Sequence, residues 1–525
     1  MKAVKKHAAL LAVLVIISAA CFLFAGRKEG MFIDEIYSYG LANSYYAPFV
    51  TDLKDGDMLD KVMTRQELVD YLSVGEGDGF AFGSVYYNQI RDVHPPLYYW
   101  LLNIASSLTP GVFSMWTGLV LDYIIYMLTL IMLYALVMKL LGSRTAAVSA
   151  VILYGLSAIG LSTMLMIRMY VLLTLLTVLL AYGVASLMVD GRKIGYGICA
   201  AAVFLGLMTQ YYFVFYAFFL CGFYVIYALF KKQFKRAAVF TLSAFAAVGL
   251  FVLAFPACFD HLFADALVSG GNALENLKSV WQYGERLRIF IIDVAYRMQA
   301  VIFIIPILVI VCLLRVKRLW AAFKRKELRL ESLIIIIPSF FTFVLVAIIS
   351  PIPAMRYVYN LIPIFTLVDA LLLYWLLDVD ADMLPKLIKF AAVIFVAYYA
   401  LIHIRTVTPD FIYDEYSDYD ALLTAHSDAP CVYMNDNFNS PITYDMLQLL
   451  NFQDFIVTAD TSSEAMLEYI GDSDKVVVFI DISKVWASGY DADEVLEGLC
   501  ESTGFEIVSN LYSNGFSDVY LMEDR

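Results

Sequence analysis

The sequence predicts an α-helical polytopic membrane protein that carries a small α/β domain at its C-terminal end. Hydrophobic residues make up 61% of the 525 residues and charged residues only 16%, and the mean hydropathy is +0.74. Apolar runs recur from residue 8 to residue 404, and the composition becomes acidic after residue 408. A water-soluble globule of ordinary composition is excluded, because runs of about 20 apolar residues are the signature of membrane spans.

Eleven apolar runs have roughly the length of a membrane span. They lie at residues 8–25, 117–138, 146–163, 169–189, 194–209, 212–230, 237–257, 295–314, 333–350, 356–377 and 386–404. The stretch 97–109 is also apolar, but prolines flank it, and a helix of about 13 residues reaches only ~20 Å. We therefore expect eleven spans and, at 97–109, a re-entrant or interfacial helix.

Basic residues indicate how these spans are oriented. In an eleven-span topology the basic connections all fall on the side of the N-terminus, including the seven basic residues between Arg315 and Arg329. Lys and Arg are enriched in cytoplasmic loops, so this side is predicted to be cytoplasmic. The protein is then a multi-pass protein of the cell membrane, with the loop 26–96 and the C-terminal tail outside the cytoplasm.

The C-terminal tail differs from the rest of the chain in charge. Residues 408–525 contain 24 acidic and only 3 basic residues. Short runs of strand-forming residues alternate there with helical stretches, which is typical of a small α/β domain. We predict a membrane domain at 1–407, with a first extracytoplasmic loop at 26–96, and a soluble extracytoplasmic domain at 408–525. Cys431 and Cys500 could pair in that compartment.

An acidic pair, Asp34 and Glu35, directly follows the first apolar run, where the chain leaves the bilayer. A carboxylate at the membrane surface could accept a proton from a substrate. The alternative is an ordinary solvated helix end. The second polar cluster, Arg91-Asp92-Val93-His94-Pro95-Pro96-Leu97-Tyr98-Tyr99, also precedes an apolar run, so two polar clusters meet one interface.

A divalent metal ion could be bound at this interface. His94 together with Asp34 or Glu35 would suit Zn²⁺ or Mn²⁺. Only one histidine is at hand, however, so a helix-capping role or a hydrogen bond to substrate is favoured for His94. No cofactor is therefore certain.

Further polar residues interrupt or open the later apolar runs. Arg168 lies between two runs, where an arginine costs a few kcal/mol unless it is paired or hydrated. Arg356-Tyr357 opens a run, and a guanidinium there could hold a lipid phosphate through two parallel hydrogen bonds. Interfacial anchoring is the alternative for both arginines. Gln210, followed by two tyrosines, is also explained by an interfacial aromatic belt.

The order of these motifs resembles the GT-C superfamily of integral-membrane glycosyltransferases. Within it, the chain resembles the protein O-mannosyltransferases and the bacterial lipid A aminoarabinose transferases, over about residues 1–405. The shared motifs are an acidic pair after the first span, His-Pro-Pro-Leu-Tyr-Tyr some sixty residues later, Arg-Met-Tyr between spans, an aromatic pair after Gln210, and Arg-Tyr opening a late span.

The resemblance implies roles for the candidate residues. Asp34 would be the catalytic carboxylate with Glu35 beside it, Arg356 would hold the donor phosphate, and Arg168 would support the substrate pocket. The remaining candidates for substrate binding are His94, Tyr98, Tyr170, Gln210 and Tyr357.

The sequence departs from these relatives in two places. They often have Glu-Ala ahead of the arginine of Arg-Met-Tyr, where this chain has Met166 and Ile167, and His is common where Gln210 stands. Both departures concern the acceptor side of the pocket.

The predicted function is that of an inverting glycosyltransferase. By resemblance it would move a sugar from a polyprenyl-phosphate-linked donor to a protein, lipid or cell-envelope glycan at the outer face, with no nucleic-acid partner. Inversion requires one base for the acceptor and cations on the departing phosphate, and no nucleophilic carboxylate.

Two other classes of function compete with this one. A transporter or flippase for a lipid-linked substrate would place charges near the membrane midplane, whereas here they collect at one interface. A membrane-anchored sensor would explain the acidic tail but not His94 and Arg356.

Overall fold

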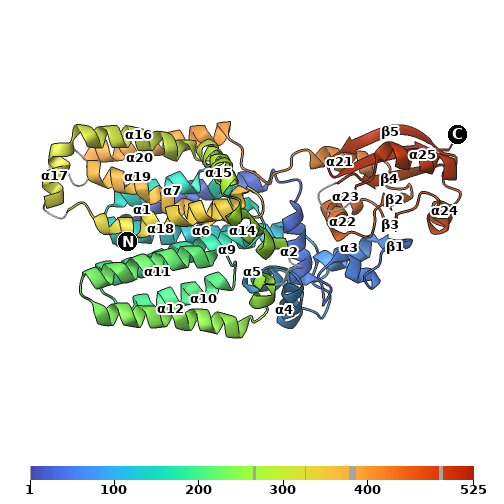
Figure 1. Ribbon diagram of the computed structural model, residues 1–525. Helices are drawn as coiled ribbons and strands as arrows, with labels where there is room; N and C mark the ends of the chain where they lie inside the picture. The colour runs from blue at the N-terminus through green and yellow to red at the C-terminus, as the bar shows by residue number, and fades with distance from the viewer. Residues whose placement is uncertain (1, 264–267, 325–326, 378–385, 484–488, 525) are drawn as a thin grey trace. The chain divides into compact units, whose positions relative to one another are not determined.

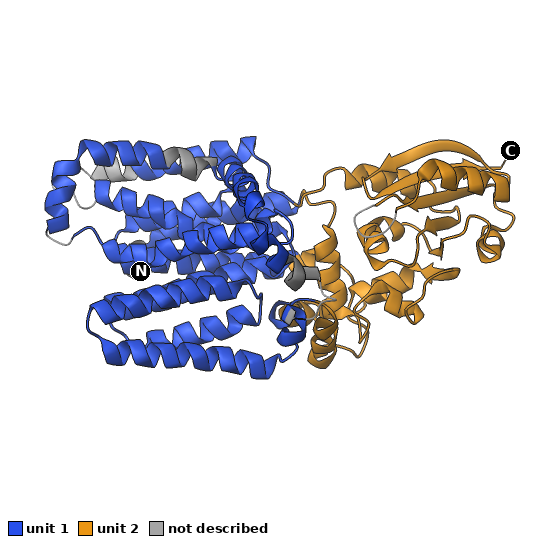
Figure 2. Cartoon of the chain, in the orientation of Figure 1, with its two compact units in different colours: residues 1–26, 93–98, 119–410 blue, residues 27–92, 99–118, 411–525 orange. Residues whose placement is uncertain are grey.

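The computed structural model describes residues 2–263, 268–324, 327–377, 386–483 and 489–524 (Figure 1). The chain forms two compact units. Unit 1 comprises residues 1–26, 93–98 and 119–410, and unit 2 comprises residues 27–92, 99–118 and 411–525 (Figure 2). Unit 2 therefore combines the first predicted loop with the C-terminal tail.

Unit 1 is helical, and the apolar runs of the sequence form its helices. Seven helical segments are long and apolar enough to cross a membrane in the part of the chain that the structure describes. They lie in α1 (Lys2–Ala25), α6 (Met115–Leu141), α9 (Tyr170–Val189), α11 (Phe213–Phe230), α12 (Phe234–Ala254), α18 (Leu333–Ile349) and α19 (Ile362–Leu377), the last preceded by the 3-10 helix η4 (Met355–Leu361).

Two of the other four predicted spans are bent or short. Helices α7 (Arg144–Gly155) and α8 (Ala158–Leu165) pass the same test together but are bent by 60°. Helix α10 (Ile194–Leu207) has 14 residues, which corresponds to ~21 Å of helix. The other two form α16 (Gln299–Leu314), with 16 residues, and α20 (Lys386–Thr406), with 21 residues. The multi-pass helical fold is thus confirmed, and the described residues include seven candidate spans, or eight if the bent pair forms one span.

The bend between α7 and α8 has a local cause in the sequence. The Ser157 hydroxyl caps α8 by accepting a hydrogen bond from the Gly160 amide at 3.0 Å. A Cβ at Gly160 would lie only 2.2 Å from the Tyr154 carbonyl oxygen, so glycine permits this close approach. The bend places the end of α8 at the polar residues described below.

Unit 2 contains a six-stranded mixed sheet with the order β1-β3-β2-β4-β6-β5. Strands β2, β3 and β4 are parallel, and the other pairings are antiparallel. The strands are β1 (Lys61–Thr64), β2 (Cys431–Met434), β3 (Asp454–Thr458), β4 (Lys475–Asp481), β5 (Glu506–Ser513) and β6 (Ser517–Glu523). Helices α24 (Glu464–Ile470) and α25 (Ala492–Thr503) pack on one face, where Met466 and Leu496 meet Val432 and Val478. The predicted small α/β domain is confirmed.

The two cysteines of the tail do not form a disulfide, and all seven cysteines carry free thiols. Val432 and Met434 of β2 pack with α24 and α25. Because side chains alternate along a strand, Cys431 points to the opposite face of the sheet, away from Cys500 on α25. The pairing considered from the sequence is therefore not formed.

The first loop supplies the edge strand β1 of this sheet. Residues Lys61–Thr64 pair with Asp454–Thr458, with Met63 opposite Phe455. Two asparagines that follow β2 hold the same loop: the Met58 amide donates to Asn437 at 2.8 Å and the Thr51 amide to Asn439 at 2.9 Å. The sequence-based division assigned residues 26–96 to the membrane domain, whereas the structure groups this loop with the tail. Covering an exposed sheet edge explains the grouping physically.

Four helices complete the loop region and its continuation. They are α2 (Ile33–Asn43), α3 (Arg65–Leu72), α4 (Phe82–Arg91) and α5 (Leu97–Ser106). Helix α5 occupies most of the apolar stretch 97–109 and has ten residues, so its ~15 Å cannot cross a bilayer. The short helix expected there is thus present.

Replacing Met63 with alanine should destabilise unit 2, because this β1 side chain is fully buried. Truncating a buried methionine typically costs about 2–5 kcal/mol. Hydrogen exchange of the full-length chain, read by mass spectrometry, should show faster exchange in peptides covering β3. Val62→Ala, at the exposed neighbouring position of β1, should change little. Equal protection in both variants would show that β1 does not stabilise the sheet.

Candidate active site

Arg168 is a buried arginine at the break between α8 and α9. The chain leaves the helix at Met166, makes a tight turn in which the Arg168 amide donates to the Met166 carbonyl at 2.7 Å, and re-enters a helix at Tyr170. Only 4% of Arg168 is exposed, and its apolar neighbours Ile167 and Met169 are fully buried. A guanidinium in such surroundings requires polar partners.

His94 is one of those partners. Nη2 of Arg168 lies 3.4 Å from Nδ1 of His94. Because a guanidinium can only donate, Nδ1 must accept, which assigns the ring proton to Nε2. The His94 segment is itself held in unit 1, since the Leu97 amide donates to the Met208 carbonyl at 3.0 Å. Nε2 is therefore the protonated ring nitrogen of His94.

Tyr98 has a different environment from its neighbour His94. Its hydroxyl donates to Oδ1 of Asp122, on α6, at 2.9 Å, and both residues are fully buried. This contact favours a role for Tyr98 in fixing the His94 segment to the helices. Asp122 was not singled out from the sequence, because a single acid inside an apolar run carries no pattern.

Arg356 and Tyr357 lie on η4 and are both half-buried. The Arg356 guanidinium lies over the Tyr357 ring at 5.3 Å, and that ring packs edge-on against Tyr212 at 5.6 Å. Two residues further on, Tyr359 packs against Tyr170 at 6.3 Å. The 3-10 helix η4 therefore contacts the start of α9 and the residue before α11.

Gln210 lies in the turn between α10 and α11, next to these tyrosines in the sequence. It is 5% exposed. Its backbone N–H donates to the Gly206 carbonyl at 3.0 Å, and its backbone carbonyl accepts from the Phe213 N–H at 3.1 Å. Of the predicted residues in unit 1, His94 and Arg168 are in direct contact, and Tyr170, Arg356 and Tyr357 take part in the aromatic contacts around η4. Gln210 is two residues from Tyr212, which belongs to the same contacts.

Asp410 is a junction in unit 1 that the sequence did not reveal. Its carboxylate pairs with Arg297 of α15 (Tyr283–Arg297) and accepts from the Tyr359 hydroxyl at 3.4 Å, and its amide donates to Ser162 of α8 at 2.8 Å. Arg297 also pairs with Asp293 at 2.8 Å. These contacts tie η4 to α8 and α15, and so hold the element that carries Arg356.

Arg286 binds the end of α18, the helix that precedes η4. Its Nε donates to the Ala347 carbonyl at 3.1 Å, and its Nη2 donates to the Ser350 carbonyl and, at 3.2 Å, to the Ser350 hydroxyl. It therefore caps the C-terminal end of α18, five residues ahead of η4, where a cation is also favoured by the helix dipole. Burial lowers the pKa of Arg286, and capping offsets part of the cost of burying this charge.

Glu35 of unit 2 is a structural carboxylate. It is fully buried and lies 3.1 Å from the Lys28 ammonium, which also donates to the Phe411 carbonyl at 2.6 Å. The second contact of Glu35 is with the Phe32 amide at 2.7 Å, at the start of α2. Glu35 thus anchors α2 and the beginning of the tail within unit 2.

Asp34 differs from Glu35 in exposure. It lies in the first turn of α2 and is half-buried. Successive residues of a helix point about 100° apart, which accounts for the different surroundings of the two acids.

The divalent metal ion considered at His94, Asp34 and Glu35 requires a group of ligands. Among the described residues, no three or more His, Cys, Asp or Glu side chains are grouped so that they could hold a metal ion. The contact of His94 with Arg168 agrees with a hydrogen-bonding role.

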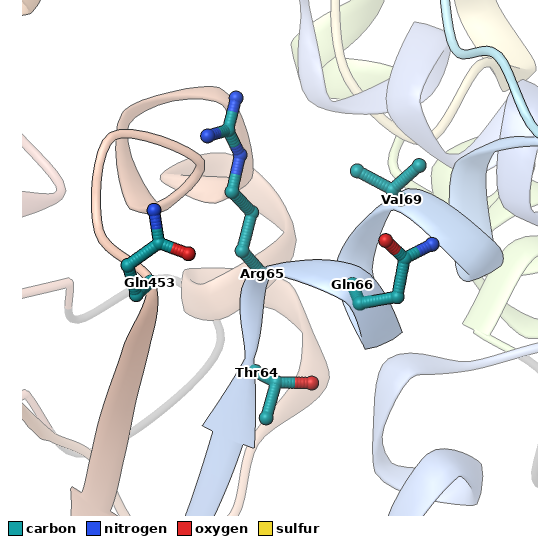
Figure 3. A pocket seen from close by; sticks show the side chains of 5 residues that line it. All are labelled: Thr64, Arg65, Gln66, Val69 and Gln453. Atoms are coloured by element: carbon teal, nitrogen blue, oxygen red, sulfur yellow. The ribbon is translucent and has the colours of Figure 1, made fainter.

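Unit 2 also has an open polar depression beside the β1–β3 pair. Thr64, Arg65, Gln66, Val69 and Gln453 line it, and Figure 3 shows Arg65 and Gln453 side by side at its rim. The backbone N–H of Arg65 donates to the backbone carbonyl of Gln453 at 2.8 Å. The first loop and the C-terminal tail therefore both line the depression. None of the predicted site residues lines this depression.

Comparisons with known proteins address the membrane part and the fold. Residues 93–257 match the family model described as dolichyl-phosphate-mannose-protein mannosyltransferase. This segment contains His94, Tyr98, Arg168, Tyr170 and Gln210. No curated protein sequence matches the chain.

The solved structures that are similar to the whole chain include two of one protein. ArnT from Cupriavidus metallidurans bound to undecaprenyl phosphate has a TM-score of 0.51 at 11% identity, over 98% of this chain and 98% of that chain. The apo state of the same protein gives 0.50 at 12% identity, over 99% of this chain and 98% of that chain. The resemblance predicted from the sequence is confirmed: this chain is a multi-pass membrane protein with the fold of ArnT, and its residues 93–257 match the mannosyltransferase family model.

Proposed function

We propose that the protein is an inverting glycosyltransferase that moves a sugar from a polyprenyl-phosphate-linked donor to an acceptor at the outer face of the membrane. The observation that supports this most directly is the contact between Arg168 and His94 just before α9, together with the packing of η4, which carries Arg356, against Tyr170 at the start of α9. Charges at helix ends suit a reaction at the membrane surface, where a lipid phosphate resides.

Arg356 is the proposed ligand of the donor phosphate. A guanidinium can grip a phosphate with two parallel hydrogen bonds, and its charge stabilises the phosphate as it leaves C1 of the sugar. The Tyr357 ring lies under the guanidinium, and the contact of Tyr359 with Asp410 limits the movement of η4. The structural relative ArnT has been solved bound to undecaprenyl phosphate, which supports a polyprenyl carrier here.

Asp34 is the proposed general base. Its carboxylate would take the proton of the acceptor hydroxyl as that oxygen attacks C1, and the polyprenyl phosphate would depart with the bonding electrons. Glu35, buried against Lys28, would hold α2 in place. His94, oriented by Arg168, would donate a hydrogen bond through Nε2 to a substrate oxygen.

The acceptor side is the least specified part of the proposal. A protein, a lipid and a cell-envelope glycan all offer suitable hydroxyls. Unit 2 contains 35 acidic and 9 basic residues, so it would repel a polyanionic acceptor over about a Debye length, ~8–10 Å at physiological salt. Neutral or cationic acceptors are therefore favoured.

The proposed topology has unit 2 outside the cytoplasm. A cysteine introduced at Ser417, an exposed position of the tail, should react with a membrane-impermeant maleimide in intact cells. The wild-type protein measures the background labelling of the seven native thiols, five of which are buried. Labelling only after permeabilisation would place the tail in the cytoplasm and contradict the topology.

Deletion of the gene distinguishes a transferase from a flippase. Mass analysis of the deletion strain should show a glycolipid or glycoprotein that has lost one sugar, together with accumulation of the polyprenyl-phosphate sugar. Complementation with wild type should restore the sugar, and complementation with Asp34→Asn should not. If the protein were a flippase, its deletion would instead leave the donor on the cytoplasmic side. Restoration of the sugar by Asp34→Asn would argue against catalysis at this residue.

A further inference from the structure

Helix α17 (Val316–Lys324) connects two membrane helices of unit 1. It follows α16 after a single residue, and α18 begins at Leu333. In Figure 1 the axis of α17 runs across the axes of α16 and α19 at the end of the bundle. A short helix that is tied directly to the end of a span and runs across it lies along the membrane surface.

The apolar residues of α17 face outward. Val316, Leu319, Trp320 and Phe323 follow the i, i+3, i+4, i+7 spacing of one helix stripe. Val316 and Trp320 are 57% and 58% exposed, whereas Ala322 on another side of the helix is fully buried. The protein therefore packs against α17 through its small residue and leaves the large apolar stripe uncovered.

The aromatic part of this stripe is ordered by its own contacts. The rings of Trp320 and Phe323 stack at 5.3 Å, and the Lys324 ammonium lies 5.8 Å from the centre of the Trp320 ring. Indole and ammonium groups side by side are typical of the headgroup level of a bilayer, where the ring is half immersed and the charge stays hydrated.

Basic residues surround the stripe. Lys317, Lys324 and Arg329 are exposed, and the segment from Arg315 to Glu331 contains seven basic and two acidic residues. The connection is fixed to the membrane helices, because Trp375 of α19 donates to the Leu328 carbonyl at 2.8 Å and Tyr374 to the Glu327 carbonyl at 3.1 Å. The basic residues are thus held at the bundle end next to the exposed stripe.

We propose that α17 is an interfacial helix that binds anionic phospholipids. Its stripe of Val316, Leu319, Trp320 and Phe323 enters the boundary between headgroups and acyl chains, and Lys317, Lys324 and Arg329 bind the phosphates around it. Burial of the stripe and attraction of the basic residues act together, which is the known basis of binding by amphipathic helices. This surface is separate from the residues proposed for sugar transfer.

The test measures lipid selectivity of the full-length protein. Wild type and the variant K317Q/K324Q/R329Q are reconstituted into nanodiscs of equimolar phosphatidylglycerol and phosphatidylcholine, extracted with mild detergent, and analysed for retained lipid. Wild type should retain phosphatidylglycerol several-fold over phosphatidylcholine, and the variant should approach equal retention. The matched control is K231Q/K232Q/K235Q, which removes three exposed charges from the connection between α11 and α12 and from the first turn of α12. This variant should keep most of the preference.

A second measurement addresses immersion of the stripe. Brominated lipids quench tryptophan emission at short range, so the difference between wild type and Trp320→Phe should contain a strongly quenched component. Equal loss of selectivity in both charge variants would show a general effect of net charge and overturn the proposal. Absence of quenching at Trp320 would overturn it as well, because the stripe would then lie in water.

Discussion

Replacing Asp34 with asparagine should lower the rate of sugar transfer by about 10²- to 10⁴-fold, the range typical for loss of a general base. The amide keeps the shape of the side chain but cannot take the acceptor proton. Donor binding should remain largely intact, because the proposed phosphate ligand, Arg356, is unchanged. Single-turnover transfer and equilibrium binding of a polyprenyl-phosphate sugar would measure the two effects separately.

Glu35→Gln is the matched control, and its expected effect is of another kind. Glu35 is buried against the Lys28 ammonium, and removing one partner of a buried pair typically costs about 3–5 kcal/mol. The variant should therefore unfold at a lower temperature, whereas Asp34→Asn should stay within about ±0.5 kcal/mol of wild type. If Asp34→Asn turns over normally and folded Glu35→Gln is inactive, the base is Glu35. If both turn over normally, the base lies elsewhere.

Replacing Arg356 with lysine should abolish most transfer although the positive charge is kept. An ammonium is a point charge on a flexible stem, and it cannot reproduce the planar two-pronged grip of a guanidinium on phosphate. The loss should appear as weaker donor binding together with a lower rate, since the same contact holds the phosphate before and during departure. Donor titrations of the purified variant would show both changes.

Arg288→Lys provides the matched control for this substitution. Arg288 is exposed on α15 and pairs with Glu285 at the surface, where an ion pair contributes little to stability. The control should bind donor and transfer sugar as wild type does. Wild-type activity of Arg356→Lys with unchanged donor dependence would remove the phosphate role from Arg356.

Residues with a strong local pattern were predictable from the sequence. Arg168 stood out because an arginine between two apolar runs is rare, and the structure buries it beside His94. The eleven apolar runs all became helices, although their lengths in the structure range from full spans to the short α10. Such features depend on composition alone, which the sequence displays directly.

Residues defined by long-range contacts were not predictable. Asp410 and Arg297 are more than one hundred positions apart, and only the packing of α15 brings them together. Arg286 and Arg288 look alike in the sequence, yet one caps α18 and the other faces solvent. The helix that carries them lies mostly between the apolar runs 237–257 and 295–314, so nothing in the sequence indicated which arginine turns inward.

The strands of unit 2 show the same limit. Runs such as Lys475–Asp481 are rich in β-branched residues and were expected as strands. Strand β1 has only four residues, Lys-Val-Met-Thr, within an acidic loop, and its pairing partner lies almost four hundred positions away. Its conformation is set by the open edge of β3, which only the folded tail provides.

The central claim is sugar transfer from a polyprenyl phosphate with inversion at C1. The most direct measurement incubates the purified protein in detergent or nanodiscs with its membrane lipid extract as acceptor and a panel of isotopically labelled polyprenyl-phosphate sugars, then follows released polyprenyl phosphate by mass spectrometry and the anomeric configuration of the product by NMR. We predict release of polyprenyl phosphate in step with a labelled product of inverted configuration, in wild type and not in Asp34→Asn. Product with retained configuration, or transfer that Asp34→Asn supports at the wild-type rate, would contradict the account.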